Sequence, residues 1–442
     1  MFRSNSFSLK NSASHKTKQY LFGKNELSIV SIAFLALFLI ATNLSSLVSV
    51  YIYSIACFLY IAFFDFKRGI FAVFLNIVYL GYSYIEFPAN FIFGTSELIT
   101  LCVVLLVARW LVFRFIINSH SEKAIRLNYF TIVALIVALY FSLSRYQISL
   151  FSIASMFFSI FCAIIFSNEL DSKEYASNIA TALFVILSTV VLYYFVWTRN
   201  IFSIHDYWIG NRFTGVRDPN NFALFANYTI VLFCIAKDRI SKSYRFLAVA
   251  LLSIGVIATI SLSGIFSLLA IYVFILISKK KVKSILILLS ICIIAFAFYK
   301  IIGSLNVSQS TTLGAIIIRF QNLFQSLSKG DYYSATTTRF GIWEQYLGIF
   351  NSLSSKEKVF GNISLIDKRL IDGEMASHNT FIDVLISYGI VGLSLFLLLI
   401  IVFFIKSIAN KKYWQAVLCL IFVTNLFFRT ILSTFLWIGI LS

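Results

Sequence analysis

The stretch NTFIDVLISYGIVGLSLFLLLIIVFF, residues 379–404, is a long and largely apolar run. About 20 apolar residues in a helix are enough to cross the hydrocarbon core of a bilayer. Because hydrocarbon offers no partners to backbone donors and acceptors, such a segment must close its hydrogen bonds internally, which an α-helix does. The stretch therefore predicts a membrane-spanning helix.

The rest of the chain repeats this pattern. Of its 442 residues, 60% are hydrophobic and 12% are charged, two are proline, and the mean hydropathy is +0.90. A soluble core cannot bury so much apolar surface. Runs long enough to span recur from 27–43 to 414–428, and the longest, 246–278, is expected to break at the sequence SLSG, residues 261–264. The expected fold class is all-α: a polytopic integral membrane protein with about 12–14 transmembrane helices.

Lysine and arginine are distributed unevenly among the connecting segments. With the N-terminus placed in the cytoplasm, the inner segments carry 21 of these residues and the short outer segments carry four. Cytoplasmic loops are enriched in both residues, so this orientation is the expected one. The net charge of +18 then reflects topology and attraction to anionic membrane lipids. Nucleic acid is not an expected partner.

This topology divides the chain into four parts. Residues 1–26 form a basic cytoplasmic tail, and residues 27–302 form a transmembrane bundle of about 11 spans with an outer loop at 198–221. Residues 303–376 form one large outer loop, and residues 377–442 hold the C-terminal transmembrane helices.

Two further features bear on this division. Apolar residues at helical spacing in 313–327 predict a helix at the membrane interface, which either shields the bundle or serves function. The six cysteines all lie in apolar runs and none has metal-ligand spacing, so we expect neither disulfides nor zinc. No other metal or cofactor is expected.

The first of three polar stretches on the outer side is NRFTGVRDPNN, residues 211–221. Asp218 followed by Pro219 is typical of the N-cap and first position of a helix. Arg212 and Arg217 lie just ahead of the positive end of that helix. Together they predict a site for phosphate or diphosphate, although the arginines could instead pair with lipid phosphates or with Asp206.

The second stretch is TRFGIW, residues 338–343. Arg339, Trp343 and Tyr346 are spaced to share one face of a helix, which would place a guanidinium beside two aromatic rings. Such a face can hold an anion and stack on a sugar. The alternative is an amphipathic helix packed on the bundle.

The third stretch is SHNT, residues 377–380. His378 is expected at the N-terminus of a span, after Ser377 as the capping candidate. The positive end of a helix disfavours imidazolium, so the ring stays neutral and can accept a proton as a general base. Because a lone histidine at such a place is more often structural, the assignment depends on its neighbours.

These pieces, taken in order, resemble the O-antigen polymerase (Wzy) and O-antigen ligase superfamily over roughly residues 177–405. The residues that carry the resemblance are RFTGVRDPNNFA at 212–223, TRFGIW at 338–343, Phe360-Gly361, HNTF at 378–381 and GIVGL at 389–393. In one departure, Leu262 stands in the SLSG break where many relatives carry an arginine. An anion held there would need Arg212, Arg217 or Arg339 instead.

The resemblance implies glycan transfer from an undecaprenyl-diphosphate donor on the periplasmic face of the bacterial inner membrane, without metal or nucleotide sugar. His378 would deprotonate the acceptor hydroxyl, while Arg217 and Arg339 would neutralise the departing lipid diphosphate. The other candidates, all for substrate binding, are Arg212, Asp218, Asn220, Trp343, Tyr346 and Asn379.

Polymerase and ligase differ in the acceptor, which is a lipid-linked repeat unit for a polymerase and the lipid A core for a ligase. The sequence RDPNNFA, residues 217–223, favours the polymerase. Asp218 is a rival base, although its capping position favours a structural role. A flippase or other transporter is less favoured, because ionisable residues at mid-membrane and duplicated halves are not evident. The expected partners are undecaprenyl-diphosphate-linked oligosaccharides and membrane lipids, with a chain-length regulator as a further candidate.

Overall fold

A computed structural model describes residues 28–40, 46–64, 69–73, 75–76, 95–112, 136–137, 140, 172–192, 219–278, 312–331, 339–362, 365, 377 and 379–426. Every regular element in these ranges is a helix, which confirms the all-α prediction for them. The main helices are α2 (Ser46–Phe63), α4 (Thr95–Leu111), α7 (Ser172–Leu192), α8 (Pro219–Ile235), α9 (Lys242–Ala258), α10 (Leu262–Ser278), α12 (Thr312–Ser328), α14 (Arg339–Ser352), α15 (Ser355–Phe360), α17 (Thr380–Ala409) and α18 (Tyr413–Leu426).

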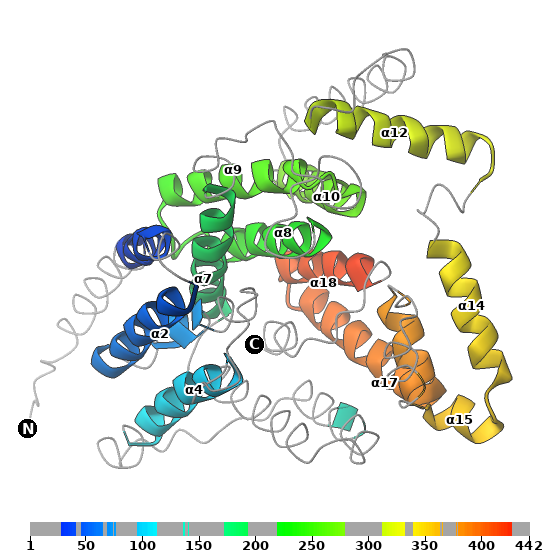
Figure 1. The fold of residues 1–442 in the computed structure, drawn as a ribbon, viewed down its shortest axis with the longest axis horizontal. Coiled ribbons are helices and arrows are strands. Elements are labelled where there is room, and N and C mark those ends of the chain that lie inside the picture. The colour runs from blue at the N-terminus through cyan, green and yellow to red at the C-terminus, as the bar shows by residue number, and fades with distance from the viewer. Residues whose placement is uncertain are drawn as a thin grey trace, which may run out of the picture.

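Helix α8 lies at the centre of the packed helices, with α7, α9, α10 and α18 against it (Figure 1). Small residues allow the closest of these approaches. A Cβ added to Gly264 of α10 would lie 2.5 Å from the Cβ of Ala223 in α8, so no larger residue fits there without displacing one helix. Asn227 of α8 also donates a hydrogen bond to the Gly264 carbonyl at 2.8 Å. The spacing of α8 and α10 is thus fixed by shape and by a polar contact.

The predicted break between two helices is found, but at residues 259–261 rather than 261–264, because Leu262 already begins α10. Helix α9 ends at Ala258 and α10 begins at Leu262, with the residues between them in a turn. Helix α8 begins at Pro219, as the sequence predicts, while the capping candidate Asp218 lies outside the described residues. The Ser261 hydroxyl donates to the side-chain oxygen of Asn220 at 2.7 Å. The start of α8 and the α9–α10 turn therefore lie at the same end of the bundle.

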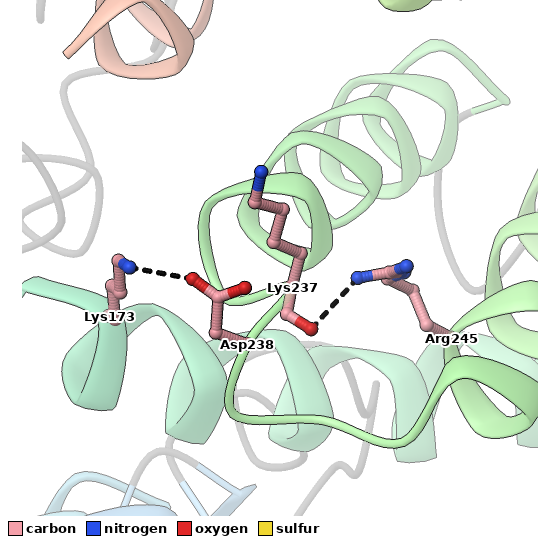
Figure 2. Close-up of polar contacts among 4 residues, drawn as sticks. All are labelled: Lys173, Lys237, Asp238 and Arg245. Atoms are coloured by element: carbon pink, nitrogen blue, oxygen red, sulfur yellow. Dashed lines mark hydrogen bonds and ion pairs between the residues drawn. The ribbon is translucent and has the colours of Figure 1, made fainter. Parts of the chain in front are cut away.

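Basic residues gather at the opposite end of these helices (Figure 2). Lys173, at the start of α7, forms an exposed ion pair of 2.7 Å with Asp238 in the turn after α8. In the same turn, the carbonyl of Lys237 accepts a 3.0 Å hydrogen bond from Arg245 of α9. Three basic residues that the sequence places on the inner side are thus brought together at one end.

Helix α17 differs from the single continuous span predicted over 379–404. Gly389 has φ 69° and ψ −171°, so the element consists of a short helix, 380–388, followed by a longer one, 390–409. The rings of Phe381 and Phe396 lie 5.9 Å apart, although a straight helix would separate these positions by about 22 Å.

By length and composition, one helix in the described part of the chain could cross a membrane, namely Thr380–Ala409. Its portion after the break would still be about 30 Å long, at about 1.5 Å per residue. The shorter apolar helices are Ser28–Ile40, Tyr51–Phe63, Leu101–Leu111, Ala176–Thr189, Phe222–Ile235 and Leu262–Leu276.

Candidate active site

The second and third polar stretches meet where α14 packs against the short helix 380–388. The indole N–H of Trp343 donates a 3.0 Å hydrogen bond to the carbonyl of Ser377, the residue before His378. Further along α14, Tyr346 packs with Ile382 and Ile386 of α17 in a small apolar cluster. One helix therefore holds Arg339 at its first position and Trp343 one turn later, with Trp343 bonded to the segment that contains His378. His378 itself lies outside the described residues.

The structure gives Tyr346 of α14 a role other than the predicted one, whereas the prediction for Trp343 is not tested. Tyr346 is 2% exposed and is buried between α14 and α17, so its ring offers no open face to a sugar. Trp343 is half-buried, and its N–H is engaged by Ser377. The packing interpretation of this face is therefore the correct one for Tyr346. The spacing of Arg339, Trp343 and Tyr346 indicated that they share one face of a helix, but it could not indicate that α17 covers that face at Tyr346.

The N-cap of α17 is Asn379, not Ser377 as predicted. The side-chain oxygen of Asn379 accepts hydrogen bonds from the backbone N–H groups of Phe381 at 2.9 Å and Ile382 at 3.3 Å. The residue is buried, so the structure assigns it a capping role and shows no exposed amide that could bind substrate. Both residue types cap helices well, which is why the sequence did not separate them.

Ser377 connects the cap to a carboxylate that the sequence interpretation missed. Its hydroxyl donates to Asp383 at 2.5 Å and accepts from the Asn379 backbone N–H at 2.9 Å. Asp383 is 4% exposed and lies in the first turn of α17, where the helix end favours a negative charge. A signal was available, because Asp383 is the one charged residue in 379–404, and an ionisable group in an apolar run indicates function.

Replacing Asn379 separates capping from substrate recognition. Asn379→Ala will lower stability by about 1 kcal/mol through loss of the cap, whereas Asn379→Ser will retain most of it because serine caps a helix nearly as well. Thermal unfolding of the purified variants measures this difference, and activity is expected to follow the same order. If Asn379→Ser folds normally but loses activity as completely as Asn379→Ala, the amide contacts substrate.

A second contact fixes the short helix 380–388 from its other end. Gly361, the C-cap of α15, and Gly389, at the break in α17, both have positive φ and lie backbone against backbone. A Cβ on Gly389 would fall 2.2 Å from the carbonyl oxygen of Val359. The Asn362 backbone N–H donates to the Ile386 carbonyl at 2.8 Å, and the Tyr140 hydroxyl donates to the Tyr388 carbonyl at 2.8 Å. Two separate glycine motifs of the sequence are thus one structural unit.

The start of α15 is held by a capping box. Glu357 accepts hydrogen bonds from the Ser354 hydroxyl at 2.7 Å and the Ser354 backbone at 3.0 Å, and from the Asn362 amide at 2.7 Å. These bonds favour the carboxylate, so they lower the pKa of Glu357, the Ser354 hydroxyl contributing most. Because Asn362 also bonds to Ile386, this exposed network continues directly into the α17 contact.

The remaining candidates fall into two groups. Asn220 lies at the start of α8, where it bonds to Ser261 of the SLSG break. Arg212, Arg217 and Asp218 lie outside the described residues. The structure therefore joins TRFGIW to SHNT, and joins the start of α8 to the α9–α10 turn. Within the described ranges, no group of three or more His, Cys, Asp and Glu side chains is placed to hold a metal ion.

The fold and the site define a class: an all-α protein in which a broken helix presents a capped, partly polar N-terminus to a neighbouring helix that carries arginine and tryptophan. No protein-family model, no curated protein and no solved structure matches the chain.

Proposed function

We propose that the protein is a polytopic membrane glycosyltransferase that polymerises a surface polysaccharide. It would transfer the glycan chain from an undecaprenyl-diphosphate donor to a lipid-linked repeat unit on the periplasmic face of the bacterial inner membrane. The observation that carries this proposal is the hydrogen bond from Trp343 to Ser377. It links the helix of Arg339 to the segment of His378, two groups that the proposed reaction needs at one place.

Membrane insertion is supported by the distribution of polar and apolar side chains. The helices bury polar groups, including Thr181, Ser188, Thr189 and Asn227, and expose large apolar ones, including Phe246, which is 77% exposed. Polar side chains between helices and apolar ones facing outward are typical of proteins in lipid. Along the longer part of α17, the exposed apolar residues are Ile390, Leu397, Leu398, Ile401, Ile405 and Ile408.

The distribution of charge supports the orientation. The basic residues around Lys173, Lys237 and Arg245 occupy the end of the bundle opposite the Asn220–Ser261 contact. Lysine and arginine favour the cytoplasmic side, so the end with Asn220 would be periplasmic. A donor with an extended polyprenyl tail could then remain in the outer leaflet while its diphosphate and sugar reach the site.

The chemistry is a single displacement at the anomeric carbon. His378 accepts the proton of the acceptor hydroxyl as its oxygen attacks that carbon, and the bond from the carbon to the diphosphate oxygen breaks. The lipid diphosphate leaves with the electron pair, and Arg339 and Arg217 stabilise the charge that develops on it. One displacement of this kind inverts the anomeric centre. Asp383 accepts a hydrogen bond from the hydroxyl of Ser377, the residue before His378.

The test is a gel of surface glycolipid from a strain deleted for the gene, with and without the gene restored. A polymerase predicts loss of the ladder, leaving a single repeat unit on lipid A core. Bare core with full-length polymer left on undecaprenyl diphosphate would instead indicate a ligase. An unchanged ladder would contradict both and favour a transporter or another polysaccharide.

A further inference from the structure

Helix α12 presents an arginine that the three polar stretches do not include. One aromatic contact attaches it to the bundle: the ring centroids of Phe320 and of Phe266 in α10 lie 6.2 Å apart, edge to face. Within α12, Phe320 also stacks on Phe324, with 6.1 Å between the ring centroids. Phe266 lies one turn after Leu262, at the start of α10. Arg319, next to Phe320, is thereby held on a helix that is docked close to the α9–α10 break.

Arg319 is partly buried in an unfavourable environment. Its Nε atom is buried and has no hydrogen-bond partner among the described residues. Burial lowers the pKa of the guanidinium, and the nearby cation of Arg339 lowers it further. Arginine stays protonated in proteins even so, and its five N–H groups all act as donors. The guanidinium groups of Arg319 in α12 and Arg339 in α14 therefore repel each other. The buried Nε–H of Arg319 also has no acceptor among the described residues.

An anion placed between the two guanidinium groups would offset their repulsion and would accept a hydrogen bond from the buried Nε–H of Arg319. Guanidinium groups bind phosphoryl oxygens in a bidentate way, and burial strengthens such bonds because water competes less. A diphosphate offers two phosphoryl groups, one for each arginine. A single carboxylate would leave one of the two cations with fewer partners.

We propose that Arg319 and Arg339 together form a binding site for a diphosphate group. That this group belongs to the polyprenyl-linked donor rests on the proposed function, whereas the binding of diphosphate itself does not. Arg319 would then be a second contact to the leaving group, supplied by the large loop between 303 and 376. Helix α12 would be part of the active site as well as a cover for the bundle.

The first experiment measures binding of inorganic pyrophosphate to the full-length protein by calorimetry, in nanodiscs of neutral phosphatidylcholine. Arg319→Gln and Arg339→Gln are each expected to weaken binding by about tenfold or more, the loss expected for a charge-assisted bidentate contact. Lys329→Gln is the matched control, because Lys329 is an exposed cation at the end of the same helix. Wild-type affinity in Arg319→Gln would overturn the proposal, as would an equal loss in Lys329→Gln.

Thermal unfolding distinguishes a binding residue from a structural one. Without pyrophosphate, Arg319→Gln should unfold at the same temperature as the wild type or higher, because the substitution removes a repelled, partly buried cation. With pyrophosphate, the wild type should gain more in unfolding temperature than the variant. A variant that unfolds at a lower temperature without ligand would show that Arg319 supports the fold, and would overturn the proposal.

A second series in nanodiscs of anionic phosphatidylglycerol separates the two sources of phosphate. A diphosphate site keeps its Arg319-dependent affinity for pyrophosphate there, whereas displacement by the lipid headgroup would overturn the diphosphate assignment. These measurements need no sugar transfer. If pyrophosphate binding depends on Arg319 but the protein forms no polymer in cells, the binding site is supported and the proposed function is rejected. If the protein forms polymer in cells but Arg319→Gln binds pyrophosphate as the wild type does, the proposed function stands and the Arg319 site is rejected.

Discussion

Under the proposed function, replacing His378 with alanine is expected to stop polymer growth while the protein continues to be made and inserted. Removal of a general base typically costs about 10²–10⁴-fold in rate, enough to erase the ladder of long chains from a glycolipid gel. The described residues on either side of His378 are held in place. Ser377 is held by Trp343, and Asn379 caps the helix that follows, so the backbone on both sides of His378 is fixed.

The matched control is His205→Ala, since His205 is the other histidine expected on the outer face. It should retain the full ladder. His378→Gln, which keeps a polar side chain of similar size but cannot act as a base at neutral pH, should behave as His378→Ala does. A complete ladder from either His378 variant, at wild-type protein level, would remove this residue from the mechanism and direct attention to the buried carboxylate of Asp383.

Local signals in the sequence predicted several parts of the fold correctly. Pro219 marked the start of α8, because proline fits the first turn of a helix. The polar sequence SLSG marked the turn between α9 and α10, and the spacing of apolar residues in 313–327 marked α12. Each of these features depends on neighbouring residues alone. They could therefore be predicted without knowledge of the packing.

The break at Gly389 could not be predicted in this way. A glycine within a long apolar run is tolerated in a helix, so the residue by itself does not indicate a break. What decides its conformation is the backbone of Gly361, in a segment distant along the chain. The burial of Tyr346 has the same origin, because the neighbouring helix α17, not the sequence around Tyr346, covers that side chain.

Arg319 was overlooked in the sequence because the segment around it was interpreted as a helix at the membrane interface. The apolar pattern of 313–327 indicated an interface helix, and the arginine within it was counted neither as a topology signal nor as a site residue. The sequence interpretation restricted an anion near Leu262 to Arg212, Arg217 or Arg339. The contact between Phe320 and Phe266 brings the helix that carries Arg319 to the same region, which adds a fourth arginine.

Replacing Gly389 with alanine is expected to cause the largest loss of stability. The residue has φ 69° and ψ −171°, a region that essentially only glycine adopts, and holding a residue with a Cβ there costs about 1–3 kcal/mol. The new Cβ would also lie 2.2 Å from the Val359 carbonyl oxygen and 2.6 Å from the Gly361 nitrogen, and relief of such overpacking costs about 1–3 kcal/mol more. Both neighbours are backbone atoms, so no flexible side chain can move aside. A total of about 2–6 kcal/mol is a large fraction of the roughly 5–15 kcal/mol that typically stabilises a folded protein.

The comparison that isolates this effect is Gly348→Ala in α14. An added Cβ at Gly348 meets nothing within 4 Å, so alanine there should be neutral or should stabilise the helix by up to about 1 kcal/mol. Thermal unfolding of the two purified variants should therefore shift in opposite directions, or only Gly389→Ala should shift. Gly361→Ala should resemble Gly389→Ala, and the double variant should lose less than the sum of the two, because both substitutions disrupt one contact. Since that contact positions the short helix that follows His378, transfer should fall together with stability. An unfolding temperature equal to that of the wild type in Gly389→Ala would mean that α17 is continuous and that the site is built differently.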